Sequence, residues 1–263
     1  MRIGLFAPYG ALSQESGLIF LLGNYLRRLS PDVVQLRCNG MFSICDRDAE
    51  SGWSRSFHGC FRCMAEQREF AQWSGLPIQE LSQYLEPTDV ERTRRMVAGV
   101  PIEQLPWFQF EGENLFSMAL GSWQNRFNVS RPDLKNSLHE QVMRRFMLSA
   151  SRAYLAARQQ QRVFQPVLTV VAGTNDFMSR AIAAAGRATG RAVAPCIWDV
   201  SRRAVMVNHP RGAGALPCEL LLDGLVDMRA DPATWSPMLL GILDELLSFL
   251  EISPREHQRA AIP

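Results

Sequence analysis

Lysine is almost missing from this chain of 263 residues, in which Lys135 is the single example. Arginine therefore carries the positive charge, and the arginines are scattered among acidic residues to give a formal net charge of +2. Nucleic-acid-binding proteins concentrate basic side chains on one face or along one stripe. This sequence has no such stripe, so we do not expect it to bind nucleic acid.

The sequence also lacks a long apolar run. Residues 17–22 form the longest one near the start, and they are far too few to span a bilayer. Residues 1–8 have the pattern of a strand and not that of a secretion signal. We therefore expect no membrane span and a location in the cytoplasm, where thiols stay reduced.

Cysteine is sparse but unevenly placed. The chain has 6 cysteines, too few for a disulfide-stapled scaffold, and its 47% hydrophobic content is enough for a sizeable core. Cys38, Cys45, Cys60 and Cys63 nevertheless fall close together, with the spacing C-x6-C-x14-C-x2-C. Two thiolates separated by two residues can hold one metal ion from a single tight turn. The pattern predicts a metal site made of these four side chains.

The identity of the metal stays open. Zinc takes four sulfurs in a tetrahedron, and an iron–sulfur cluster takes the same number of thiolates. Two disulfides or four unrelated buried thiols are the structural alternatives. His58 lies two residues before Cys60 and can replace one sulfur or hydrogen-bond to the site. Cys196 and Cys218 lie in apolar runs and are expected in the core.

Hydrophobic periodicity predicts an α/β fold with a Rossmann-like parallel sheet. Apolar runs at 2–8 and 33–37 read as strands, and leucines at helical spacing over 13–29 read as the helix between them. A strand–helix–strand unit of this length is typical of a right-handed parallel crossover. Cys38 follows the second strand, and ligands of open α/β sheets bind at the carboxyl ends of strands.

We expect one α/β domain over residues 1–263, with a cysteine-rich metal-binding insert at about 38–85 and a helical section at about 86–162. The insert contains one helical passage, 63–73, and few apolar residues. We therefore expect a bound metal to stabilise its fold. A second α/β half covers about 163–263. Its expected elements are strands at 167–172, 192–198, 204–207 and 219–225, a helix at 177–189 and a last helix opened by Ser236. The helical section before this half should contain a long helix at about 132–162.

Weaker candidate sites lie in this second half. Gly173, Thr174, Asn175 and Asp176 join a strand to a helix, where backbone amides can hold a phosphate or carboxylate. The run lacks the spacing of a dinucleotide fingerprint or a phosphate-binding loop with lysine, and an ordinary cap by Thr174 or Asn175 explains it equally well. Asp199 and His209 are further candidate ligand contacts, with a local ion pair and a plain surface loop as the alternatives.

The cysteine-bearing runs resemble a known family. Arg37-Cys-Asn-Gly-Met-Phe-Ser-Ile-Cys45, His58-Gly-Cys-Phe-Arg-Cys63 and Leu81-Ser-Gln-Tyr-Leu85 are similar to the amino-terminal half of glycosyltransferase-like proteins from bacterial capsule and surface-polysaccharide loci. The later order, with its Gly-Thr-Asn turn and Ser179-Arg180-Ala181 helix, is similar too. The resemblance implies two facing Rossmann-like lobes, of which the carboxyl-terminal lobe binds the nucleotide sugar, and this chain matches only the first lobe.

Three functions follow as hypotheses. The resemblance favours a non-catalytic, metal-binding accessory or regulatory protein of surface-glycan assembly. Such a protein would act through a partner such as a glycosyltransferase or a glycan-export component, or as a homodimer. The first alternative is a small glycosyltransferase or related transferase with a cleft at Gly173 to Asp176, Asp199 and His209. The second is an iron–sulfur redox protein.

Overall fold

The chain divides into two compact units, Met1–Val193 and Ala194–Pro263. The computed structural model describes residues 2–6, 19, 22–23, 26–27, 30–47, 57–173, 175–199, 204–207 and 218–221. The predictions for Thr174, His209 and the last helix lie outside these residues. Within them, the α/β Rossmann-like fold is confirmed.

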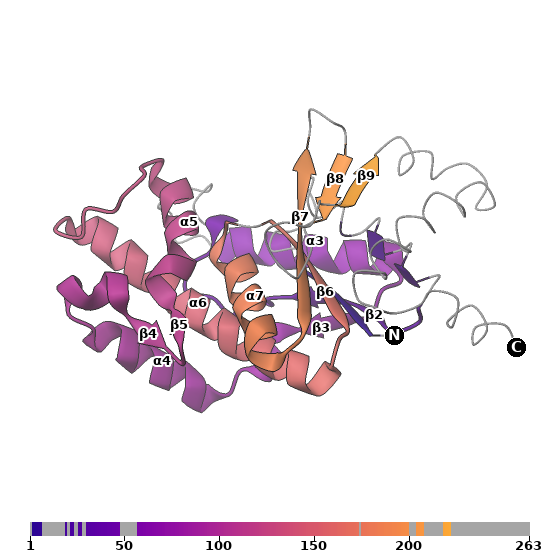
Figure 1. Cartoon of the computed structure of the whole chain (residues 1–263), viewed down its shortest axis with the longest axis horizontal. Coiled ribbons are helices and arrows are strands. Elements are labelled where there is room, and N and C mark those ends of the chain that lie inside the picture. Colours follow the sequence, from indigo (N-terminus) through magenta and orange to yellow (C-terminus); the bar gives the residue numbers. More distant parts are fainter. Residues whose placement is uncertain are drawn as a thin grey trace, which may run out of the picture. The chain divides into compact units, whose positions relative to one another are not determined.

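The first unit contains a parallel sheet. Its strands are β1 (Ile3–Phe6), β2 (Val33–Arg37), β3 (Ile78–Glu80) and β6 (Leu168–Ala172), and they lie in the order β3-β2-β1-β6 (Figure 1). The register pairs Ile3 with both Val33 and Leu168. β1, β2 and β6 are buried along their whole length, as is usual for parallel strands covered on both faces.

Helices make up most of the remaining first unit. Asn136 caps α6 by accepting from the amides of Leu138 and His139, so this helix begins later than the predicted residue 132. Gly190 closes α7 in the left-handed conformation, as predicted. The bounds are α3 (Phe57–Ser74), η1 (Leu81–Tyr84), α4 (Pro87–Gly99), η2 (Ile102–Trp107), α5 (Leu115–Phe127), α6 (Ser137–Phe164) and α7 (Phe177–Thr189), with a hairpin of β4 (Gln109–Phe110) and β5 (Glu113–Asn114).

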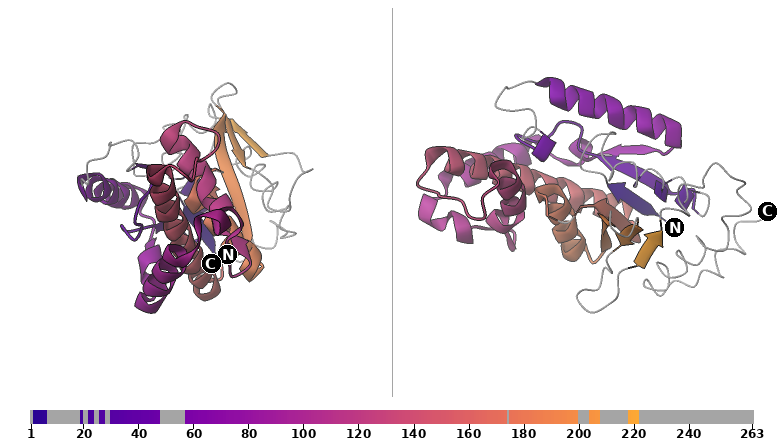
Figure 2. Two further views of the ribbon diagram at one scale, coloured as in Figure 1. Left: turned by 90° about the vertical axis from the view of Figure 1, so that its left-hand side faces the viewer. Right: turned by 90° about the horizontal axis from the view of Figure 1, so that it is seen from above.

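The two faces of the sheet carry different layers. α3 lies over one face, and α6 and α7 lie over the other (Figure 2). Side chains alternate along a strand, so β2 sends Val34 and Leu36 to the α6 and α7 face, where both join the main hydrophobic cluster. Gln35 and Arg37 take the opposite face and are nevertheless buried, at 9% and 4% exposure. We call these the apolar face and the α3 face.

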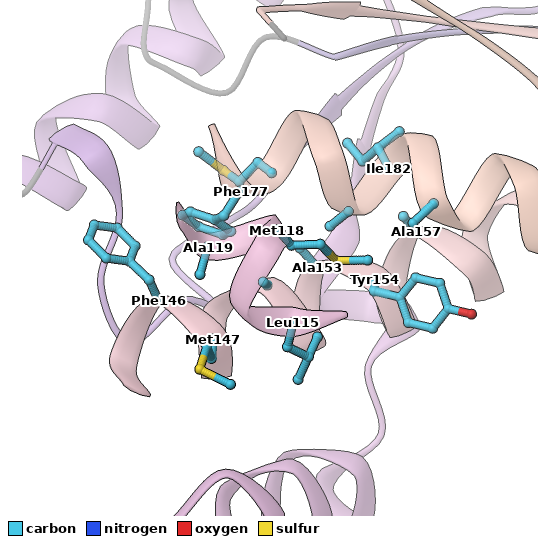
Figure 3. Packing of buried hydrophobic residues seen from close by; sticks show 14 of the residues in the cluster. Leu115, Met118, Ala119, Phe146, Met147, Ala153, Tyr154, Ala157, Phe177 and Ile182 are labelled. Carbon is cyan, nitrogen blue, oxygen red and sulfur yellow. The ribbon is translucent and has the colours of Figure 1, made fainter. Parts of the chain in front are cut away.

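The apolar face holds the core. Phe146 of α6 and Phe177 of α7 meet with their ring centroids 5.9 Å apart, and both are fully buried (Figure 3). Phe42 meets Phe177 edge-on at 5.1 Å. Trp123 of α5 is also fully buried, and its indole Nε1 donates to the carbonyl of His139. This layer buries large aromatic side chains while still pairing the polar atom of the largest one.

The described residues between 38 and 85 belong to the layered structure. Ile78–Glu80 form β3, which pairs with β2, and α3 covers the sheet. Leu81 and Ile44 join the main hydrophobic cluster. A separate cysteine-rich insert is therefore not confirmed, because this stretch supplies a strand and a helix to the first unit.

The second unit is described through its strands. β8 (Ala204–Val207) pairs antiparallel with β7 (Ala192–Asp199) and with β9 (Cys218–Leu221). Cys196 in β7 is buried, as expected for a core thiol. The assignment of residues 1–263 to one domain stays a prediction. Among the helices of the described residues, none is long and apolar enough to cross a membrane.

Candidate functional site

Cys38 begins the turn that follows β2. Asn39 and Gly40 both have left-handed backbones, with φ of 52° and 72°. The Asn39 side chain holds this turn, because its Nδ2 donates to Glu80 Oε2 at 2.6 Å and to Ser82 Oγ at 3.2 Å. A Cβ on Gly40 would lie 3.4 Å from Cys60 Sγ. The turn therefore brings the backbone after Cys38 against the thiol of Cys60.

Cys60 and Cys63 lie on α3. The helix was expected to begin at Cys63 but begins at Phe57, so the pair is in a helix and not in a tight turn. Cys60 and Cys63 are therefore not held by a tight turn. They lie on one face of a helix, because residues three apart share a face. Cys63 is buried and Cys60 is half-buried, whereas Phe61 between them is 63% exposed.

The thiols are near enough to affect one another's ionisation. The pKa of the Cys38 thiol is raised from 9.0 to about 12, chiefly by burial; a hydrogen bond from the Gly40 backbone opposes the shift, and the nearby thiols of Cys63 and Cys60 add to it. Desolvation penalises the charged form, so Cys38 is a neutral thiol at pH 7. The structure therefore gathers Cys38, Cys60 and Cys63 around the carboxyl end of β2.

Cys45 packs against the main hydrophobic cluster of the apolar face. Its loop is fastened to α6 by reciprocal bonds, because Ser43 Oγ donates to the Arg145 carbonyl at 3.0 Å and Arg145 Nη2 donates back to the Ser43 carbonyl at 2.5 Å. Ser149 Oγ adds a bond to the Ile44 carbonyl at 2.9 Å. The loop that carries Cys45 is thus tied to the helical layer.

Five cysteines are free thiols. Cys38, Cys45, Cys60, Cys63 and Cys196 form no disulfide with one another, so pairwise bridging of the four predicted ligands is absent from this part of the chain. The same described residues contain no group of three or more His, Cys, Asp or Glu side chains already positioned to hold a metal ion. The donor chemistry suits a soft metal, but the sulfurs have to move closer together to bind one.

Arg37 is the charged group next to these thiols. Its side chain is 5% exposed, and its Nη2 forms an ion pair with Glu80 Oε1 on the adjacent strand. Nε and Nη1 are buried and have no hydrogen-bond partner among the described residues. Burial and the charge of Arg68 lower the pKa of Arg37, whereas Cys38 raises it. A guanidinium with two unused donors therefore lies in electrostatic contact with Cys38.

Gln67 extends the polar character of the α3 face. It is 3% exposed, and its Nε2 donates to Cys63 Sγ at 3.7 Å. Its Oε1 is buried without a partner in the described part of the chain. A buried, incompletely bonded amide is costly in a folded protein, so its place beside a thiol calls for an explanation.

Known proteins add no further information about this site. No family model, no curated protein and no solved structure matches the chain. The resemblance to the capsule-locus proteins therefore stays a prediction, and the chemistry has to be argued from the residues themselves.

The Gly173 to Asp176 turn is bonded mainly within the protein. Gly173 has a φ of 92°, and Asp176 caps α7 by accepting from the Ser179 amide at 2.9 Å. The cap is thus Asp176 and not Thr174 or Asn175, because its buried carboxylate also accepts from Ser179 Oγ at 2.5 Å. Burial raises the pKa of Asp176, and the bonds from Ser179 oppose that shift.

Other contacts occupy further groups at the N-terminus of α7. The Phe177 amide donates to Ser122 Oγ at 2.9 Å, and Ser122 Oγ donates to Asp46 Oδ2 at 2.8 Å. Asn175 Oδ1 accepts from Arg180 Nη2 at 2.6 Å. Two first-turn amides of α7 thus already have protein partners, which leaves fewer donors for an anionic ligand.

The remaining candidates are described only in part. His58 lies in the first turn of α3 and Asp199 ends β7, but their side chains lie outside the described residues. Ligand binding by Gly173, Thr174, Asn175, Asp176, Asp199 and His209 stays a prediction.

Sequence reasoning missed Arg37, Glu80 and Gln67. A usable signal was present, since Val33-Val34-Gln35-Leu36-Arg37 alternates polar and apolar residues within a strand that is buried on both faces. Polar side chains in a buried strand need hydrogen-bond partners, and a group left without one needs an explanation. The alternation in β2 therefore indicates which face of the sheet holds the buried polar side chains.

Proposed function

We propose that this protein binds a metal through its cysteine cluster and serves as an accessory or regulatory protein of bacterial surface-glycan assembly, acting through a protein partner. The single observation that supports metal binding is the meeting of Cys38, Cys60 and Cys63 beside the buried, incompletely bonded Arg37. Cys45 is the proposed fourth ligand, and zinc the proposed metal, with an iron–sulfur cluster as the alternative.

The thiols suit this role chemically. Coordinating thiols lose their protons, and the metal ion supplies the positive charge that the resulting thiolates need. The αL turn at Asn39 and Gly40 fixes Cys38 near α3, and Ser149 holds the loop of Cys45. Coordination would need the sulfurs to close around one ion, while the sheet and α6 stay in place.

The partner role is supported by one surface feature. Phe61 is 63% exposed, and it lies within the Cys60–Cys63 motif. Arg62 beside it is held by Glu66, whose Oε1 lies 2.7 Å from Arg62 Nε. Exposed aromatic and arginine side chains are typical anchors of protein interfaces. A partner would therefore dock on the segment that the metal orders.

Metal analysis of a double variant tests the proposal. We expect Cys60→Ser with Cys63→Ser to lose the metal found in the wild-type protein purified without added metal. Hydrogen exchange should then speed up in α3 and β3 more than in α6, because Cys60 and Cys63 lie on α3 and the turn after Cys38 is bonded to Glu80 of β3. Cys196→Ser is the matched control, since its buried thiol lies in β7, and it should keep the metal. Full metal retention by the double variant would remove the site.

An absorption spectrum separates the two metals. Zinc–thiolate centres are colourless in the visible range, whereas iron–sulfur clusters absorb there. The transferase alternative has its own test, in which nucleotide sugars are added and the thermal midpoint is followed. Stabilisation that disappears in Asp176→Ala and Asp199→Ala would favour the enzyme.

A further inference from the structure

We propose that His139 is a pH switch, which keeps the loop between α5 and α6, residues 128–136, closed while its imidazole is neutral. The ring accepts a hydrogen bond from the loop, and protonation removes that acceptor. This inference is independent of the proposed metal site, because it involves none of the cysteines.

The His139 ring packs against two aromatic side chains of α5. Its centroid lies 5.0 Å from that of Trp123, at an interplanar angle of 82°, and 4.5 Å from that of Phe127. The backbone is held as well, since the His139 carbonyl accepts from Nε1 of the fully buried Trp123 at 3.2 Å. Aromatic rings also attract cations. The imidazole should therefore stay against α5 in either charge state, so that the loop is the part that moves.

One hydrogen bond joins the loop to this ring. The Asp133 amide donates to His139 Nδ1 at 3.3 Å. A backbone N–H can only donate, so this Nδ1 carries no proton and the neutral ring has its proton on Nε2. Protonation of Nδ1 would place two donors against each other. Histidine side chains change charge between pH 5 and 8, so we expect the bond at the upper end of that range and its loss at the lower end.

The same residue organises the rest of the loop. Asp133 Oδ1 accepts from the Lys135 amide at 3.0 Å, and the Asp133 carbonyl accepts from the Asn136 amide at 3.0 Å. Asn136 in turn caps α6, through its side chain. Release of the Asp133 amide from His139 should therefore loosen the whole connection up to the first turn of α6.

The charged side chains of residues 126–144 decide which attractions compete with this release. Glu140 is paired with Arg144, because its Oε1 lies 2.7 Å from Arg144 Nε. The other charged residues of this stretch are Arg126 on α5 and Arg131, Asp133 and Lys135 in the loop. Among these four, Asp133 has the carboxylate, which attracts an imidazolium. Its attraction has to be separated from the hydrogen bond of its amide.

Cleavage after Lys135 measures the opening of the loop, because this residue is the single lysine of the chain. A lysine-specific endoproteinase therefore makes one cut, between Lys135 and Asn136. We compare the wild-type protein at about pH 8 and about pH 5.5, on the two sides of ordinary histidine titration. Each rate is divided by that of a peptide of residues 129–141 at the same pH, so that the pH dependence of the protease cancels.

The normalised rate should be about 5-fold higher at the lower pH. Proteolysis follows the population of the open form when closing is fast, and loss of one ordinary hydrogen bond changes that population by about this factor. Hydrogen exchange in β6, corrected for its intrinsic pH dependence, should stay the same. An equal acceleration in β6 would show opening of the whole unit and would overturn the inference.

Variants at the two partners assign the response. His139→Phe keeps an aromatic ring against Trp123 but accepts no hydrogen bond, so it should be cleaved at both pH values as fast as the wild type at the lower one. Asp133→Asn keeps an acceptor for the Lys135 amide without the charge, and it should retain the wild-type response. His139→Gln replaces His139→Phe if that variant does not fold, and its rate should not depend on pH.

Three results would contradict the switch. The first is a wild-type rate that is the same at both pH values. The second is a response that persists in the His139 variants. The third is loss of the response in Asp133→Asn, which would assign it to the carboxylate of Asp133.

Discussion

The two faces of the parallel sheet are built on opposite principles. The apolar face is a layer of aromatic and aliphatic side chains from α5, α6 and α7. The α3 face, at the carboxyl end of β2, buries a guanidinium and an amide whose bonding within the described residues is incomplete, next to several thiols. One strand serves both, because Val34 and Leu36 alternate with Gln35 and Arg37. Alternate residues of one strand thus serve two purposes: one set stabilises the core, and the other set contributes polar groups to the candidate site.

The largest expected effect is on the apolar face. Phe146→Ala removes a fully buried ring that contacts Phe177, and it should lower the free energy of unfolding by about 3–5 kcal/mol. Chemical denaturation measures this loss. Because the α3 face takes no part in it, the loss should be equal with and without added zinc. A zinc-dependent loss would break the separation of the two faces.

A change of opposite sign is expected on the α3 face. Gln67→Leu replaces an amide whose Oε1 is unbonded, so in the metal-free protein it should raise the free energy of unfolding by about 1 kcal/mol. Gln161→Leu is the matched control, since Gln161 is equally buried but accepts from Thr189 Oγ1 at 2.8 Å. Gln161→Leu should lower the free energy of unfolding, because the hydroxyl of Thr189 loses its acceptor. Denaturation curves in which both variants move in the same direction would contradict the comparison.

The pH dependence of the metal-free protein sharpens the same contrast. The pKa of Cys38 is raised from 9.0 to about 12, so the folded state keeps a proton that the unfolded chain releases. This contribution is complete below pH 9 and is lost as the pH rises toward 12, costing about 1 kcal/mol by pH 10. Cys38→Ser should remove this part of the alkaline slope in urea titrations. Identical slopes for the two proteins would contradict the burial of this thiol.

The smallest effects are expected at the α7 cap. Asp176→Ala should cost about 1 kcal/mol because the Ser179 amide loses its acceptor. Asp176→Asn keeps an acceptor and removes a buried charge. The raised pKa means that the aspartate contributes most at low pH, so the asparagine variant should gain on wild type as the pH rises above 3.8. Thermal midpoints across this range measure the gain, and a falling curve for the asparagine variant would refute the cause given.

Much of this fold was accessible from the sequence. Continuous apolar runs and helical leucine spacing located β1, β2, β6, α7 and β7 to within a few residues. β3 was missed because only three residues, Ile78–Glu80, form it and two of them are polar. Its place is decided by pairing with β2, a tertiary contact that no local pattern records.

The candidate site was accessible only in outline. Cysteine spacing identified Cys38, Cys60 and Cys63, which the structure brings together. It could not find Arg37 or Gln67, because their importance comes from being buried with unused donors and acceptors. Bonding of this kind depends on which helix covers which face. That arrangement is a property of the assembled layers.

The reciprocal bonds between Ser43 and Arg145 attach the loop of Cys45 to α6. Ser149 adds a further bond to the Ile44 carbonyl. The position of Cys45 is therefore set by α6, so a metal site would have to form where Cys45 already lies, and we expect the other three sulfurs to make the larger movement.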